Sequence, residues 1–91
     1  MKVKYTLDLQ INTTTKPVKY RFEDMGEYDT HEEAWQAVRE RVLKITGEDK
    51  LPNYTCYDLS PRSESTNFLI SGEMYHFIIT EIIIELDDDD E

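Results

Sequence analysis

The side chains best suited to covalent chemistry are the only cysteine and two histidines, Cys56, His31 and His76. A cysteine beside a histidine can act as a nucleophile activated by a base. Cys56 lies in YTCYD, between aromatic residues and without a cationic neighbour in the sequence that would favour the thiolate. We therefore expect Cys56 to be a small buried hydrophobe, His31 a surface residue and His76 a hydrogen-bonded residue of a strand.

Other catalytic or ligand-binding patterns are missing. The three glycines are far apart, so no phosphate-binding loop is present, and neither HExxH nor G-x-S-x-G occurs. A few neighbouring carboxylates at a helix start, or a bare run of aspartates, make weak metal sites. We predict a protein that is not an enzyme and that binds no cofactor and no metal.

Carboxylates dominate the 91 residues, with 20 Asp and Glu against 10 Lys and Arg and a net charge of −10. Residues 1–21 carry a local charge of +4, whereas the rest carries −14. Such a charge repels nucleic acid and anionic membranes. The expected partner is a protein with a basic surface, such as a nucleic-acid-binding one, unless the acidity serves only solubility.

The chain length predicts one domain, over residues 1–86, followed by an acidic, disordered tail at 87–91. No apolar run approaches the 18 residues of a membrane span, and the alternating N-terminus does not resemble a signal peptide. The single cysteine excludes an internal disulfide framework. These features predict a soluble protein of the reducing cytoplasm.

Two alternating segments open the chain. Apolar residues recur at every second position over residues 3–11 and again over 18–22, on either side of a polar turn. This period predicts an antiparallel hairpin with one apolar and one polar face, in which Tyr5 and Tyr20 point to the core side. Residues 24–29 (DMGEYD) are expected to be a connector.

A helix is predicted over residues 31–46. Thr30 and Glu33 have the spacing of a capping box, and Gly47 is a natural C-terminal stop. Glu40 and Lys44 form a favourable pair on the wet side. The side chains expected to face the core lie at helical spacing: Ala34, Trp35, Val38, Val42 and Ile45.

The remaining segments favour strands. Residues 53–59 are a tentative strand, 66–71 are a short strand, and 74–86 are the longest β-rich stretch. The predicted fold is α+β: a single small domain with a mainly antiparallel sheet of four or five strands, in the order β-β-α-β-β-β, and one helix packed on one face.

The last strand is apolar on both faces, which is typical of a strand that is covered on both sides. One helix covers only one face of a sheet, so a second cover is needed. Candidates are the 48–65 segment, a second copy of the chain or another protein. For self-association we single out Phe77, Ile79 and Ile83.

Two functional hypotheses remain. The first is a protein-binding module that imitates nucleic acid and fills the basic cleft of a nucleic-acid-handling protein; in composition it is similar to small acidic inhibitors from phages and mobile elements. The second is a homodimeric structural or regulatory protein. Direct nucleic-acid binding through the basic first hairpin is disfavoured by the net charge. The candidate partner-binding carboxylates are Glu23, Asp24, Glu27, Asp29, Glu32, Glu33, Asp87, Asp88, Asp89 and Asp90.

Overall fold

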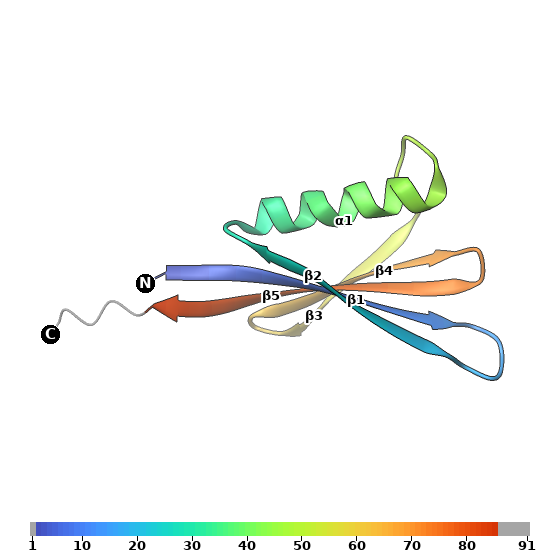
Figure 1. The fold of residues 1–91 in the computed structure, drawn as a ribbon, viewed down its shortest axis with the longest axis horizontal. Helices are drawn as coiled ribbons and strands as arrows, with labels where there is room; N and C mark the ends of the chain where they lie inside the picture. The colour runs from blue at the N-terminus through green and yellow to red at the C-terminus, as the bar shows by residue number, and fades with distance from the viewer. Residues whose placement is uncertain (1, 86–91) are drawn as a thin grey trace, which may run out of the picture.

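A computed structural model of the chain describes residues 2–85. Five strands and one helix follow in the order β1 (Lys2–Thr13), β2 (Tyr20–Tyr28), α1 (His31–Thr46), β3 (Tyr54–Ser60), β4 (Ser63–Ile70) and β5 (Glu73–Glu85). The strands form one antiparallel sheet in the spatial order β2-β1-β5-β4-β3, with α1 along one side (Figure 1). The predicted α+β class and element order are confirmed, and so is the tentative third strand. Within the described part, no helix combines the length and the apolar character needed to cross a membrane.

The helix begins and ends where the sequence signals lie. The Thr30 side chain accepts a hydrogen bond from the Glu33 amide at 3.1 Å, and the Glu33 carboxylate accepts from the Thr30 amide at 3.3 Å. This capping box satisfies donors that the first helical turn leaves without partners. At the other end Gly47 adopts a left-handed conformation with φ of 73°, and its N–H bonds the Leu43 carbonyl.

The core lies between α1 and one face of β1, β5 and β4. Nine buried apolar side chains form it: Leu7, Leu9, Ala34, Val38, Val42, Phe68, Tyr75, Phe77 and Ile79. Trp35 and Ile45 lie at its margin and are only partly buried, which corrects the expectation that Trp35 faces inward. The indole packs against Tyr54 of the outermost strand β3, with ring centroids 5.7 Å apart, and stays partly accessible.

The pairing register of β2 differs from the expected one. Tyr20 pairs with Asn12 and Phe22 with Gln10, so both aromatic residues share the polar face of β1. Tyr20 is 59% exposed and Phe22 75% exposed, whereas Tyr5 lies on the helix side. The predicted core position of Val18, Tyr20 and Phe22 is therefore wrong.

A bulge explains this register. The segment expected to be a connector is part of β2, and the β1–β2 register shifts between Thr6 and Asp8 of β1. Gly26 takes a φ of 102°, and its N–H donates to Asp24 Oδ1 at 2.8 Å. An extra residue in one strand reverses the sides on which its neighbours point.

The two edges of the sheet are unequal. β2 is interrupted by the bulge, whereas all seven residues of β3 are exposed and β3 holds no lysine and no proline. Cys56 lies on this edge strand and is therefore exposed, not buried as expected. The 48–65 segment extends the sheet sideways through β3 and does not cover its second face.

The sheet face opposite α1 is called the open face below. Alternation along the strands places Asp8, Gln10, Tyr20, Phe22, Asn67, Leu69, His76 and Ile78 on it. Figure 1 shows no other described element over this face. β5 thus has apolar residues on both faces, but α1 covers only one of them.

Candidate functional site

Most of the predicted carboxylates gather between β2 and α1. A hollow of about 390 Å³ lies over the bulged part of β2, and a second of about 420 Å³ lies over the start of α1. Both are lined by Tyr28, Ala37 and Glu40, so they form one continuous feature, called the acidic groove below. Its carboxylates are Glu23, Asp24, Glu27, Asp29, Glu33 and Glu40.

Three cationic side chains reduce the charge of the acidic groove to −3: Lys4, Arg41 and Lys44. Arg41 holds both carboxylate oxygens of Glu23, at 2.9 and 2.7 Å, and these hydrogen bonds lower the pKa of Glu23 below its usual 4.5. Lys4 Nζ lies 3.0 Å from Asp29 Oδ1, and this contact lowers the pKa of Asp29 below 3.8. Both carboxylates therefore stay ionised at neutral pH.

The remaining carboxylates of the groove differ in how they are used. Glu33 is taken up by the capping box, and Asp24 accepts from Gly26. Glu27 forms no ion pair with another residue of the described part, and neither does Glu40, which accepts only from Gln36 at 3.3 Å. The predicted Glu40–Lys44 ion pair is thus absent within residues 2–85. Glu27 and Glu40 are thus exposed carboxylates of the groove that neither an ion pair nor a backbone amide holds within the described part.

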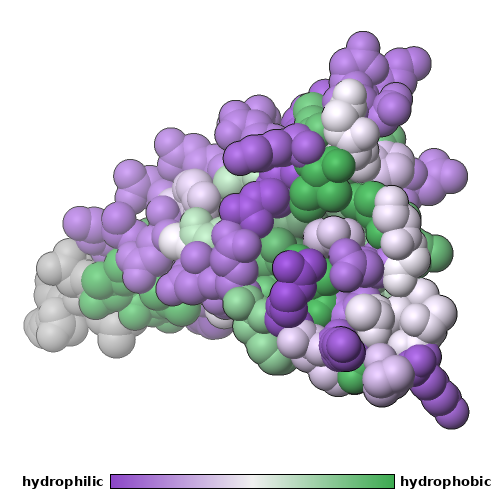
Figure 2. Space-filling view, turned by 45° about the vertical axis from the view of Figure 1, so that its right-hand side comes forward, coloured by the Kyte–Doolittle hydropathy of each residue, from purple (hydrophilic) through white to green (hydrophobic). Residues whose placement is uncertain are grey.

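The other predicted site residues lie elsewhere. Glu32 is exposed on the first turn of α1, outside the lining of the groove, and Asp87 to Asp90 lie outside the described residues. Phe77 and Ile79 are buried beneath α1, so neither side chain is accessible to a second copy in this fold, whereas Ile83 is exposed near the end of β5. Hydrophilic surface predominates in the view of Figure 2, and one of its hydrophobic areas lies beside the grey residues.

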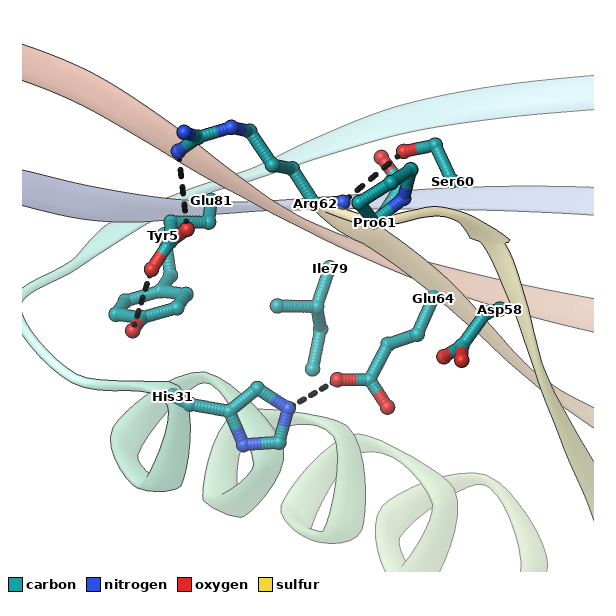
Figure 3. Close-up of a pocket in the computed structure, with 10 residues that line it drawn as sticks. Tyr5, His31, Asp58, Ser60, Pro61, Arg62, Glu64, Ile79 and Glu81 are labelled. Carbon is teal, nitrogen blue, oxygen red and sulfur yellow. Dashed lines mark hydrogen bonds and ion pairs between the residues drawn. The ribbon is translucent and has the colours of Figure 1, made fainter.

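A polar pocket of about 190 Å³ lies at the other side of the helix start (Figure 3). His31 points from α1 toward Glu64 of β4 and bonds its carboxylate, and Cys56 Sγ donates to the same carboxylate at 3.5 Å. Glu64 therefore stands between the thiol and the imidazole. Within residues 2–85 Cys56 contacts neither histidine ring, so the cysteine–histidine pairing that nucleophilic chemistry needs is not formed.

The rest of this pocket is also internally paired. Arg62 Nη1 donates to Glu81 Oε1 at 3.2 Å, and Tyr5 Oη donates to Glu81 Oε2 at 3.3 Å. Burial, followed by the charge of Glu81, raises the pKa of Tyr5 above 10. No group of three or more histidine, cysteine or acidic side chains among the described residues is arranged to hold a metal ion.

His76 is held on the open face between two asparagines. Its Nε2 lies 2.9 Å from Asn12 Oδ1, and its Nδ1 contacts Asn67 Oδ1. Burial lowers the pKa of His76 below 6.5, so the ring is neutral at pH 7 and donates from one nitrogen only. One of the two amides must then turn its NH₂ group toward the ring. These contacts tie β1, β5 and β4 together.

Sequence reasoning missed Glu40 as part of the groove. Glu40 lies seventeen residues after Glu23, and the sequence places it only on the solvent side of the predicted helix. The length of β2 would have indicated this. Because β2 continues to Tyr28, it runs beside α1 and brings Glu23 close to Glu40.

Comparison of the chain with protein-family models, with curated proteins and with solved structures found no match.

Proposed function

We propose that this protein is a non-enzymatic binding module whose acidic groove receives a basic segment of a partner protein. The observation that carries the proposal is the convergence of six carboxylates from β2, α1 and the short link between them on one continuous hollow. Glu27 and Glu40, which within the described part form no ion pair and accept from no backbone amide, gain a cationic partner when a basic segment binds.

The finer proposal is that the partner is a nucleic-acid-handling protein and that the groove occupies its nucleic-acid cleft. Duplex DNA presents one negative charge per about 1.7 Å of its axis. Carboxylates fixed on a strand and a helix offer a rigid array of negative charge of the same kind. A cleft that evolved to bind phosphates is the basic surface best suited to such an array.

Charge-neutralising variants test the groove. The double variant Glu27→Gln/Glu40→Gln removes two charges from it, and Glu48→Gln/Asp49→Asn removes two charges from the exposed segment after α1. Both, with the wild type, serve as baits for affinity capture and mass spectrometry. We expect a partner that the wild type and the control retain and the groove variant loses. Equal capture by all three baits would contradict the proposal.

Competition then tests mimicry. The captured partner is offered labelled DNA or RNA with and without this protein, at two salt concentrations. We expect displacement of the nucleic acid that weakens as salt rises, because exposed charges are screened beyond about 8 Å at physiological ionic strength. A partner that holds nucleic acid and this protein together contradicts mimicry but leaves the binding module intact.

The second candidate function, self-association, draws on a different surface from the one expected. Phe77 and Ile79 are buried under α1, but Ile83 and Ile84 near the end of β5 are exposed. Sedimentation of the wild type and an Ile83→Ser/Ile84→Ser variant at micromolar concentrations distinguishes the cases. A dimer that the variant loses supports this candidate, and a wild-type mass near 10.8 kDa removes it.

A further inference from the structure

The open face carries a further hollow, which shares Glu23 and Asp24 with the acidic groove. It measures about 330 Å³ and lies where β2, β1 and β5 run side by side. Its lining combines three carboxylates, an amide and three apolar residues: Asp8, Glu23, Asp24, Gln10, Leu9, Phe22 and Ile78. Below, it is called the Phe22 hollow.

Two of the three carboxylates of the Phe22 hollow lie opposite each other, and the third, Glu23, is held by Arg41. Asp8 pairs directly with Asp24 across the antiparallel β1–β2 register. Like charges in directly opposite positions destabilise a sheet. Neither carboxylate forms an ion pair within the described part; Asp24 only accepts from the Gly26 amide. A cation placed between Asp8 and Asp24 would therefore relieve a repulsion built into the sheet.

An exposed aromatic ring stands beside this pair. The Phe22 ring is 75% exposed. Phe22 lies two residues before Asp24 in β2, so both side chains point to the same face of the sheet. Ile78 pairs with Asp8 from the other side, so an apolar wall continues onto β5. A cation with an extended planar surface could contact the ring and the carboxylates together.

We propose that the Phe22 hollow binds an arginine side chain from the basic partner; this rests on the proposed function and extends it to the open face. A guanidinium group is planar, offers five donors and stacks on aromatic rings. It can donate to the carboxylates of Asp8 and Asp24 while one face lies on Phe22. Charge-assisted hydrogen bonds of this kind are stronger than neutral ones. Lysine, a strongly hydrated point charge, matches the hollow less well.

Charge complementarity selects this occupant over a second copy of the chain. Each copy carries a net charge of −10, so two copies repel each other. Pairing two open faces would also bring a second Asp8–Asp24 pair toward the first without supplying a cation. A basic segment brings the missing positive charge and, with its aliphatic stems, covers the exposed apolar side chains.

Peptide binding to the ¹⁵N-labelled protein tests this proposal. The probes are acetyl-Gly-Arg-Gly-amide and acetyl-Gly-Lys-Gly-amide, followed by amide chemical shifts. We expect the arginine peptide to shift residues of the Phe22 hollow and to bind more tightly than the lysine peptide. Equal affinities, or shifts confined to the acidic groove, would overturn the assignment.

Variants locate the contact. Phe22→Ala should weaken the arginine peptide about 2–5-fold, the range of an exposed cation–π contact. Asp8→Asn should weaken it about 1.5–5-fold, as for an exposed ion pair. Asp49→Asn makes the same charge change after α1 and should leave the affinity unchanged. Equal losses in Asp8→Asn and Asp49→Asn would show that only net charge matters, and the proposal would be wrong.

Capture experiments separate this inference from the proposed function. A partner lost by Glu27→Gln/Glu40→Gln but bound equally by Phe22→Ala and the wild type overturns the Phe22 hollow and leaves the acidic groove standing. A partner lost by Phe22→Ala but not by the groove variant supports the hollow and removes the groove. A wild-type dimer that Phe22→Ala dissociates would identify a second copy as the occupant and overturn the proposal.

Discussion

Arg41 of α1 holds the carboxylate of Glu23 on β2 with two hydrogen bonds, at 2.9 and 2.7 Å. This contact joins the helix to the edge strand at one end of the acidic groove. It leaves Arg41 unable to neutralise Glu40 next to it in the sequence. The arrangement thus uses the Glu23 carboxylate for the fold and leaves the Glu40 carboxylate without an ion pair in the described part.

A double-mutant cycle on Glu23→Gln and Arg41→Gln should yield a coupling of about 0.5–1 kcal/mol in the free energy of unfolding, because both side chains are partly exposed and well aligned. Urea melts of the wild type, the two single variants and the double variant measure it. A coupling near zero would show that the contact does not persist in solution.

The folding stability should depend on pH through His76. Burial lowers the pKa of its ring below 6.5, so the unfolded chain binds a proton more readily than the folded one. The stability that neutral His76 supplies is present above pH 6.5 and is lost as the pH falls through the lower folded-state pKa. Thermal melts between pH 8 and 5 should show a smaller decline for His76→Gln than for the wild type. Identical slopes in the two proteins would contradict this.

Two phenylalanines should respond differently to truncation. Phe77→Ala is expected to cost about 3–5 kcal/mol of unfolding free energy, because the ring is fully buried under α1. Phe22→Ala should change it by no more than about 0.5 kcal/mol, because the ring is mostly exposed. Chemical denaturation measures both. A large loss in Phe22→Ala would place that ring in the core and would contradict the register of β2.

Trp35→Ala should cost less than the Phe77 truncation. The indole lies at the margin of the core and packs on Tyr54 of an exposed strand. Its fluorescence should correspondingly be that of a partly hydrated tryptophan, and a soluble acrylamide quencher should reach it in the folded protein. An unfolded Trp35→Ala variant, or a fully protected indole, would show that the ring is deeper than described.

Local signals made part of this fold predictable. Thr30, Glu33 and Gly47 mark both helix ends, because capping depends only on neighbouring residues. The alternation in β1 likewise gave its buried face correctly, with Leu7 and Leu9 inward. These features depend on contacts within a few residues of one another.

Non-local features could not be predicted in the same way. The bulge at Gly26 shifts β2 by one position, and one residue is enough to move Tyr20 and Phe22 from the core to the open face. The acidic side chains near β2 were found because they are close in sequence. Their ion pairs were not, because Arg41 and Lys4 approach them only after the chain has folded back.

The unequal edges of the sheet limit how copies of this protein could assemble. Growth of a fibre by strand pairing needs a donor edge and an acceptor edge on every molecule, so that each addition leaves a new end. Here the bulge interrupts the β2 edge in mid-strand, whereas β3 offers a continuous row of backbone groups from Tyr54 to Asp58, ahead of its own register shift between Asp58 and Ser60. A pairing of β3 with β3 of a second copy uses this longer row in both molecules and is complete at two, which disfavours open-ended growth of the sheet.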